Sequence, residues 1–303
     1  MYATDETINK LIEYSKKLYN STKNNNNYNP TIQNMMILSV AAMIYYYGID
    51  NIDAIYNAFN TRIIIGNKND IIKELEKNKI LKTKIKKGIK NRTCKGLCDF
   101  ECEYINKNNF GFYKVKPSIY VVNSWNIDYF TLTEYIVHEL NHVVNTYNRN
   151  ILIKNNSYYL RSGLQLDNIN SSEVKNKNID ESINVLQTAE IMNIIRKFSK
   201  YKVKDKEISE LLKRIKYFQF IKRRGIGYEY TSDIVKELYK DGYFKLISDE
   251  SRIKGNIEEL VDYFDNKTYN GAFNELSKQL DYLPIIDYDL KKIKRIMKRF
   301  KEN

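Results

Sequence analysis

Two histidines one helical turn apart have the clearest chemical potential in this sequence. They occur in His138-Glu139-Leu140-Asn141-His142, and the chain has only 2 histidines. Residues four apart on a helix share a face, so both imidazoles can reach one metal ion at ~2.0–2.1 Å. Glu139 would lie beside a metal-bound water, whose pKa zinc lowers from ~15.7 to ~7, and could accept its proton. The motif therefore predicts His138 and His142 as zinc ligands and Glu139 as general base.

The alternative interpretation is a pair of histidines on a helix surface. Two histidines placed at random in such a chain would fall at this spacing on the order of 1% of the time. The neighbouring residues make the helix apolar around its circumference, which is typical of a buried active-site helix. They are Tyr135, Ile136, Val137, Leu140, Val143 and Val144. The sequence thus favours the buried site.

A tetrahedral catalytic site needs a third protein ligand and an open position for water. Because no other histidine exists and no cysteine follows the motif, we expect a carboxylate. The downstream candidates are Glu173, Glu181 and Glu190. Glu181 is favoured because it opens a strongly predicted helix, and Glu190, deeper in the same helix, is the alternative.

These residues resemble a known family. HELNH followed by a helix beginning DESIN resembles the HExxH zinc metallopeptidases of the gluzincin type, whose third ligand is a glutamate on a second helix. That helix is similar to the thermolysin-like form Asn-Glu-Ala-x-x-Asp, with Glu181 as the ligand. The aspartate of that form is Val185 here, so any carboxylate partner of a zinc-bound histidine must come from elsewhere or be replaced by a backbone carbonyl.

The resemblance covers roughly residues 110–200 and implies a zincin-like core, a zinc cofactor and a peptide or protein substrate. The strand PSIYVVNSW resembles the family's edge strand, which pairs with an extended substrate. The family also uses a donor in its C-terminal lobe to polarise the substrate carbonyl. Without a third histidine, Tyr228 is the expected donor, with Tyr230 and Arg161 as alternatives. The segments RSGL, GIGYEY and FDNKTYNG resemble small zincin-like proteins of AT-rich Firmicutes.

The elements that must position these residues belong to an α+β fold. Apolar periodicity predicts helices over residues 7–19, 31–47, 52–60, 129–147 and 179–198. Strands are predicted within 111–125 and 158–166, and amphipathic helices after residue 205. We therefore divide the chain into a helical N-terminal region, 1–90, a zincin-like catalytic core, 91–200, and a helical C-terminal lobe, 201–303.

Local signals set the ends of two of these helices. Gly48 is expected to end the second one, and Thr131 or Thr133 is expected to cap the N-terminus of the motif helix.

Composition bounds the class of protein and its location. The chain is 43% hydrophobic and 29% charged, as in globular proteins. Its most apolar run, residues 35–47, is shorter than the ~18–20 residues of a membrane span, so a buried helix is expected. The N-terminus lacks the apolar stretch of a signal peptide, and the cytoplasm is the expected location.

The net charge of +13, from 50 Lys and Arg against 37 Asp and Glu, suggests an anionic partner or simply a lysine-rich composition. The densest basic stretch, residues 77–95, has few aromatics and no glycine-rich phosphate cradle. A solvated surface is therefore favoured, and nucleic acid is not an expected partner. Residues 291–301 are interpreted in the same way, as the solvated face of a terminal helix.

Cys94, Cys98 and Cys102 would share one face if they lay on a helix, which would suit a structural metal site. Without a fourth ligand at the usual spacing, reduced cysteines are the favoured interpretation.

Two functions besides peptidase activity remain open at this point. One is a zincin-fold binding or regulatory protein with a basic surface that cleaves nothing. The other is a zinc amide hydrolase with a non-peptide substrate, since the metal chemistry of both hydrolases is the same.

Overall fold

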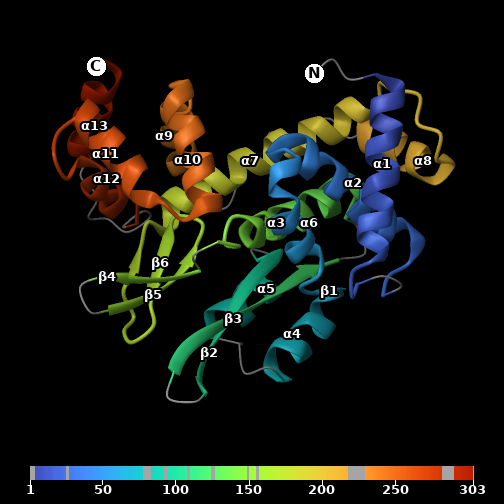
Figure 1. Ribbon diagram of the computed structural model, residues 1–303, viewed down its shortest axis with the longest axis horizontal. Helices are drawn as coiled ribbons and strands as arrows, with labels where there is room; N and C mark the ends of the chain where they lie inside the picture. Colours follow the sequence, from blue (N-terminus) through green and yellow to red (C-terminus); the bar gives the residue numbers. More distant parts are fainter. Residues whose placement is uncertain are drawn as a thin grey trace. The chain divides into compact units, whose positions relative to one another are not determined.

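The computed structural model describes residues 4–24, 27–77, 83–91, 94–107, 110–123, 127–148, 150–154, 157–217, 229–281 and 290–302. The chain forms two compact units, each made of two segments. Unit 1 comprises Met1–Val144 and Gln187–Arg223, and unit 2 comprises Asn145–Leu186 and Arg224–Asn303. Figure 1 shows their helices and strands. Both helices and small sheets occur, so the predicted α+β class is confirmed.

Unit 1 consists mainly of helices around a large apolar core, and a smaller apolar cluster joins α4 and α5 to its sheet. Its helices before the motif are α1 (Asp5–Asn20), α2 (Pro30–Tyr47), the short η1 (Ile49–Asn51), α3 (Ile52–Phe59), α4 (Lys68–Lys77) and α5 (Thr83–Lys90). Then follow α6 (Tyr129–Val144), the later part of α7 (Lys177–Phe198) and α8 (Lys206–Tyr217). The predicted helices over 7–19, 31–47, 52–60, 129–147 and 179–198 are thus confirmed within a few residues.

The most apolar run of the chain forms the centre of this core. Helix α2 buries every residue from Met35 to Ile44 and has Gly48 as its C-cap, as predicted. It is a buried helix, and none of the helices in the described ranges is both long and apolar enough to cross a bilayer.

A three-stranded sheet completes unit 1, with the order β1-β3-β2. Strand β3 (Phe110–Val122) pairs in parallel with β1 (Arg62–Gly66) and antiparallel with β2 (Gly96–Lys107). The expectation that PSIYVVNSW is an edge strand is therefore wrong. Its residues Ser118–Val122 lie opposite Arg62–Gly66 on one side and opposite β2 on the other, so β1 and β2 form the edges.

The motif helix α6 is enclosed by the rest of unit 1. It contacts α2, α3 and α8 as well as strands β2 and β3 (Figure 1). Most of its residues are buried, including Ile136, Val137 and Leu140. Burial on several sides explains why its sequence is apolar around the whole circumference.

The N-terminus of α6 is capped by a residue that the sequence did not single out. Asp128 Oδ1 accepts a hydrogen bond from the Thr131 backbone N–H at 2.7 Å, and its Oδ2 accepts one from the Thr131 hydroxyl at 2.6 Å. The expected caps, Thr131 and Thr133, lie inside the helix. A carboxylate satisfies the exposed N–H groups and the positive end of the helix dipole at once, which favours Asp128 over a hydroxyl.

Unit 2 combines a small meander with helices. The strands β4 (Ile151–Lys154), β5 (Ser157–Ser162), β6 (Gln165–Asn168) and β7 (Val174–Lys175) form an antiparallel sheet in chain order. The hairpin of β5 and β6 matches the strand predicted within 158–166. The first part of α7 also belongs to this unit.

The other helices of unit 2 pack around a second apolar core. They are α9 (Glu229–Leu238), α10 (Gly242–Lys254), α11 (Ile257–Lys267), α12 (Ala272–Asp281) and α13 (Leu290–Glu302). From residue 206 onward, every regular element in the described ranges is a helix, as the sequence predicted. The three regions 1–90, 91–200 and 201–303 are stretches of chain, and each compact unit draws on more than one of them.

The cap of α6 gives a stability prediction. Replacing Asp128 by Ala removes both hydrogen bonds to Thr131, and we expect the free energy of unfolding to fall by about 1 kcal/mol. Urea unfolding with an unchanged m-value measures this loss. Asp128→Asn is the matched control, because an asparagine oxygen caps nearly as well; an equal loss in both variants would contradict the capping role.

Candidate metal centre

Helix α6 presents its two histidines to each other across one turn. The ring centroids of His138 and His142 are 5.1 Å apart, with their planes at 85°. His142 is buried and His138 half-buried. A ligand atom of each ring can therefore be aimed at a common point while part of the site stays accessible.

The structure brings one of the three candidate carboxylates to this pair. Among the described residues, the group that offers ligand atoms for a metal is His138, His142 and Glu181, with all three ligand atoms within 4.8 Å of one another. Glu181 is the fifth residue of α7, directly after Asp180 of the first turn. The alternatives Glu173 and Glu190 are not members of this group, and Glu173 instead binds Lys175 and the Tyr159 hydroxyl.

The donor set fits a divalent cation. Ligand atoms of a tetrahedral ion at ~2.0–2.1 Å lie about 3.3 Å from one another, so three atoms within 4.8 Å need only a small contraction to close around it. Two imidazoles and one carboxylate suit zinc and also other divalent transition metals. Val185, which stands where thermolysin-like enzymes have an aspartate, is exposed on α7.

A buried polar network joins α6 to α7 within unit 1. Asn141, the residue before His142, donates from Nδ2 to Gln187 Oε1 at 3.0 Å. The Tyr47 hydroxyl, at the end of α2, donates to Asn141 Oδ1 and lies 3.3 Å from Gln187 Oε1. Gln187 stands six residues after the candidate ligand Glu181 on the same helix, and this contact fixes the register of α6 against the part of α7 that belongs to unit 1. Apart from the occurrence of a polar residue, Asn141, in an apolar helix, nothing in the sequence indicates this contact.

The general-base candidate is held against the start of an edge strand. Glu139 is only 6% exposed. A Cβ atom added at Gly96, the first residue of β2, would overlap its carboxylate and lie 2.8 Å from its Cγ and Cδ atoms. Only a glycine permits this close approach of the strand backbone.

A thiol also lies near this carboxylate. Burial, and then the negative charge of Glu139, raise the pKa of Cys94 to about 11, while Lys95 lowers it. The Cys94 thiol donates to the Gly96 carbonyl at 3.3 Å.

The cysteines do not form the helical face that would suit a metal. Cys98 and Cys102 lie on strand β2, and Cys94 precedes it. None of the three forms a disulfide. The helical arrangement considered for them is wrong because this segment pairs with β3.

The structure tests only some of the residues that were expected to polarise a substrate carbonyl. Tyr228 lies outside the described residues, and Tyr230 belongs to α9. Arg161 is only 1% exposed, and its Nη1 donates to three carbonyl oxygens inside unit 2. A guanidinium enclosed in this way cannot reach a substrate, so the alternative role for Arg161 is wrong.

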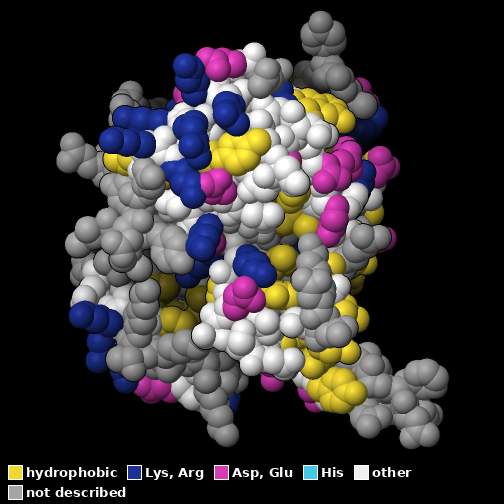
Figure 2. All heavy atoms as spheres, turned by 90° about the vertical axis from the view of Figure 1, so that its left-hand side faces the viewer, with side chains coloured by type: hydrophobic (Ala, Val, Ile, Leu, Met, Phe, Trp, Pro, Cys, Tyr) yellow, Lys and Arg dark blue, Asp and Glu magenta, His cyan; other side chains and the backbone are white. Residues whose placement is uncertain are grey.

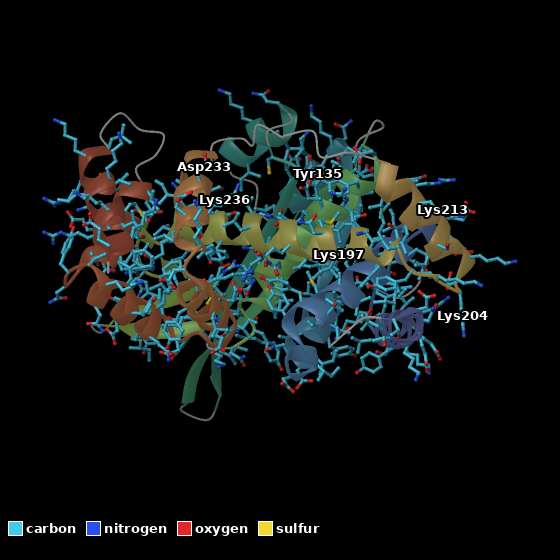
Figure 3. The ribbon with its side chains drawn as sticks, turned by 90° about the horizontal axis from the view of Figure 1, so that it is seen from above. Tyr135, Lys197, Lys204, Lys213, Asp233 and Lys236 are labelled. Atoms are coloured by element: carbon cyan, nitrogen blue, oxygen red, sulfur yellow. The ribbon has the colours of Figure 1, made fainter. Side chains whose placement is uncertain are left out.

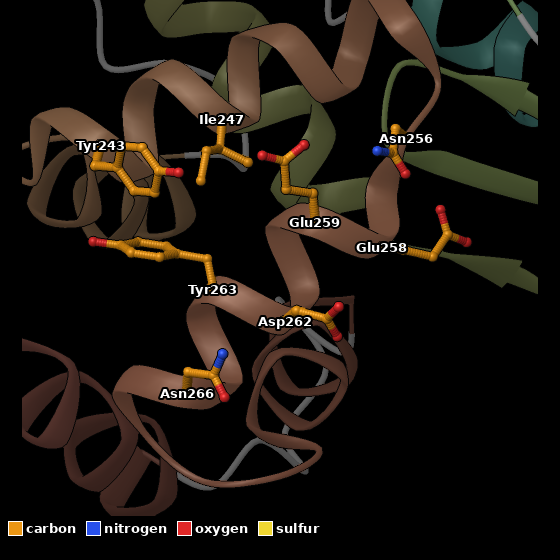
Figure 4. A pocket seen from close by; sticks show the side chains of 8 residues that line it. All are labelled: Tyr243, Ile247, Asn256, Glu258, Glu259, Asp262, Tyr263 and Asn266. Atoms are coloured by element: carbon orange, nitrogen blue, oxygen red, sulfur yellow. The ribbon is translucent and has the colours of Figure 1, made fainter.

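An open acidic pocket of about 480 Å³ lies in unit 2 along α10 and α11 (Figure 4). Its lining residues are Tyr243, Ile247, Asn256, Glu258, Glu259, Asp262, Tyr263 and Asn266. The Tyr243 and Tyr263 rings pack edge to face, with centroids 4.8 Å apart. None of the candidate ligands or Glu139 lines this pocket, so it takes no part in the metal chemistry.

Many basic side chains lie on the surfaces of both units. In unit 1, Lys197, Lys204 and Lys213 are exposed (Figure 3). In unit 2, α13 buries Ile293, Ile296 and Phe300 and exposes most of its lysines and arginines, as expected for a solvated helix face. Figure 2, which views the side carrying α13, shows acidic side chains interspersed among the basic ones.

Comparison of the chain with protein-family models, curated proteins and solved structures finds no match. The assignment of a function therefore rests on the side chains and their geometry.

The grouping of Glu181 with the histidines gives a binding prediction. Glu181→Gln removes a charged ligand, and we expect affinity for zinc to fall by at least about 100-fold, as measured by competition with a chromophoric chelator. Glu190→Gln, on the same helix but outside the group, is the matched control and should bind as the unmodified protein does. Equal losses in both variants, or a loss only in Glu190→Gln, would contradict the ligand assignment.

Proposed function

We propose that the protein is a zinc-dependent metallopeptidase with a zincin-like core. The observation that supports this most strongly is the convergence of His138, His142 and Glu181, with Glu139 next to the first histidine. A cation site alone is common to many functions. A hydrolytic metal site needs a base as well as ligands, because attack by water requires a proton acceptor. The buried carboxylate of Glu139 beside the two histidines meets that need.

The residues divide the work between binding and proton transfer. His138, His142 and Glu181 would hold the ion, which supplies a Lewis acid that polarises a carbonyl and acidifies a water. Glu139 follows His138 by one residue and projects about 100° away from it around the helix, so it is available as a base and is not grouped with the ligands. Its carboxylate takes the proton of the attacking water and then gives it to the departing amine nitrogen.

Strand β2, which begins beside Glu139, could pair with an extended peptide substrate. In the sheet order β1-β3-β2, strand β2 is an edge strand, and its first residue packs against Glu139. A peptide that adds to the sheet along β2 would pass the base with its backbone in a fixed direction. We therefore assign to β2 the substrate-pairing role that the sequence had given to residues 117–125.

Glu139 provides the direct test of the mechanism. We expect Glu139→Gln to abolish peptide cleavage while the protein keeps about one zinc per chain, because the change removes the base and no ligand. Cleavage of a peptide library, read by mass spectrometry, measures turnover, and elemental analysis measures zinc.

His138→Ala is the companion variant and should lose both zinc and activity. Cleavage by Glu139→Gln at the unmodified rate would exclude the mechanism. A protein that binds zinc but cleaves no peptide and no simple amide would instead be a catalytically silent zincin.

The contact between Gly96 and Glu139 gives a second activity prediction. A methyl group at position 96 must displace the carboxylate, and a misplacement of about 1 Å can cost about 100-fold in rate. We expect Gly96→Ala to lower turnover by about this factor with an unchanged zinc content. Gly242→Ala is the control, because a Cβ there meets no atom within 4 Å. Full activity of Gly96→Ala would show that Glu139 does not need this position.

A further inference from the structure

The residue before the candidate ligand Glu181 takes part in a fully buried ion pair. Asp180 is 1% exposed, and Arg252 of α10 is completely buried. The Arg252 Nε atom donates to Asp180 Oδ1 at 2.9 Å, and its Nη2 donates to Asn184 Oδ1, one turn further along α7, at 3.2 Å. The Arg252 guanidinium thus forms hydrogen bonds to the first two turns of α7, the helix that carries Glu181.

The turn between β5 and β6 binds the same carboxylate. The Leu164 backbone N–H donates to Asp180 Oδ1 at 2.7 Å. Gly163 has a φ of +61°, and a Cβ atom there would overlap the Asp180 carboxylate and lie 2.9 Å from Arg252 Nε. The turn can approach this closely only because residue 163 is a glycine.

A second buried guanidinium holds the first one in place. Arg161 Nη1 donates to the carbonyl oxygens of Gly163 at 2.5 Å and of Arg252 at 2.6 Å. Both the side chain and the backbone of Arg252 are therefore fixed, the latter by a residue of strand β5. Two guanidiniums, one glycine turn and one carboxylate form a single network at the start of α7.

The free-energy cost of burying these charges indicates that the network fixes a geometry more than it adds stability. A buried ion pair adds little net stability, because desolvation of the two charges offsets their attraction. Its hydrogen bonds do impose one geometry, since any other would leave a charge buried without a partner. The element fixed in this way is the helical turn that bears Glu181.

We propose that Arg252 is a positioning residue for the metal centre, which acts through Asp180 to set the place of the Glu181 carboxylate. This inference rests on the proposed metal-binding function and extends it to α10, which contributes no residue to the candidate ligand group. Partners of this kind, one step removed from a ligand, typically change metal affinity by about 10–100-fold.

Two variants test the proposal. Arg252→Lys keeps the charge but cannot form the same set of directed hydrogen bonds. The double variant Asp180→Asn with Arg252→Met removes both charges, so that neither is left buried alone, and the amide oxygen of Asn can still accept from Leu164. Asn178 of α7 also donates to the Leu280 carbonyl of α12 at 2.7 Å, which keeps the helix start attached in both variants. Lys254→Met, an exposed position of α10, is the matched control.

The measurements are zinc affinity by chelator competition and the visible spectrum of the cobalt(II)-substituted protein, with thermal unfolding of the metal-free protein as the reference. We expect both Arg252 variants to bind zinc about 10–100-fold more weakly and to show an altered cobalt spectrum, while Lys254→Met matches the unmodified protein. Unchanged affinity and spectrum in folded Arg252 variants would overturn the positioning role alone. Failure of the unmodified protein to bind zinc or cobalt would overturn the proposed function and this inference with it.

Discussion

Asn141 and Gln187 share a hydrogen bond in the interior of unit 1, and both side chains are completely buried. A buried amide that loses its partner costs roughly 1–3 kcal/mol, so α6 and α7 cannot slide past each other without a penalty. The spacing of the histidines only guarantees that they share a face of α6. The hydrogen bond adds a defined register of α6 against the later part of α7. The metal chemistry proposed for the chain depends on that register.

The individual helices of this fold could be predicted from sequence because their signals are local. Apolar periodicity, Gly48 and the apolar run in α2 all act within a few turns of chain. The order of the three-stranded sheet could not be predicted in the same way. It depends on the pairing of Arg62–Gly66 with Ser118–Val122, and such long-range pairing leaves no mark in either segment alone. The missed strand β1 is what turned the expected edge strand into a central one.

The same distinction between local and long-range signals applies to the candidate site. The candidate residues His138, Glu139 and His142 could be selected from the sequence because the chain has only two histidines and both occur in one motif. The residues that hold them in place could not, since each contact joins distant parts of the chain. Gly96 meets Glu139 from another element, and Arg252 meets Asp180 across 72 residues. Residue types that can bind a metal or transfer a proton can be recognised in a sequence. The residues that contact and position them can be identified only from the three-dimensional structure.

The raised pKa of the Cys94 thiol has a consequence for how it reacts with oxidants. With its pKa raised to about 11, the Cys94 sulfur is ionised at neutral pH in only about one molecule in ten thousand. The protonated thiol is a poor nucleophile, so we expect its reaction with peroxide to be slow. Burial, with a smaller contribution from the Glu139 carboxylate, therefore keeps this thiol in its less reactive form at neutral pH.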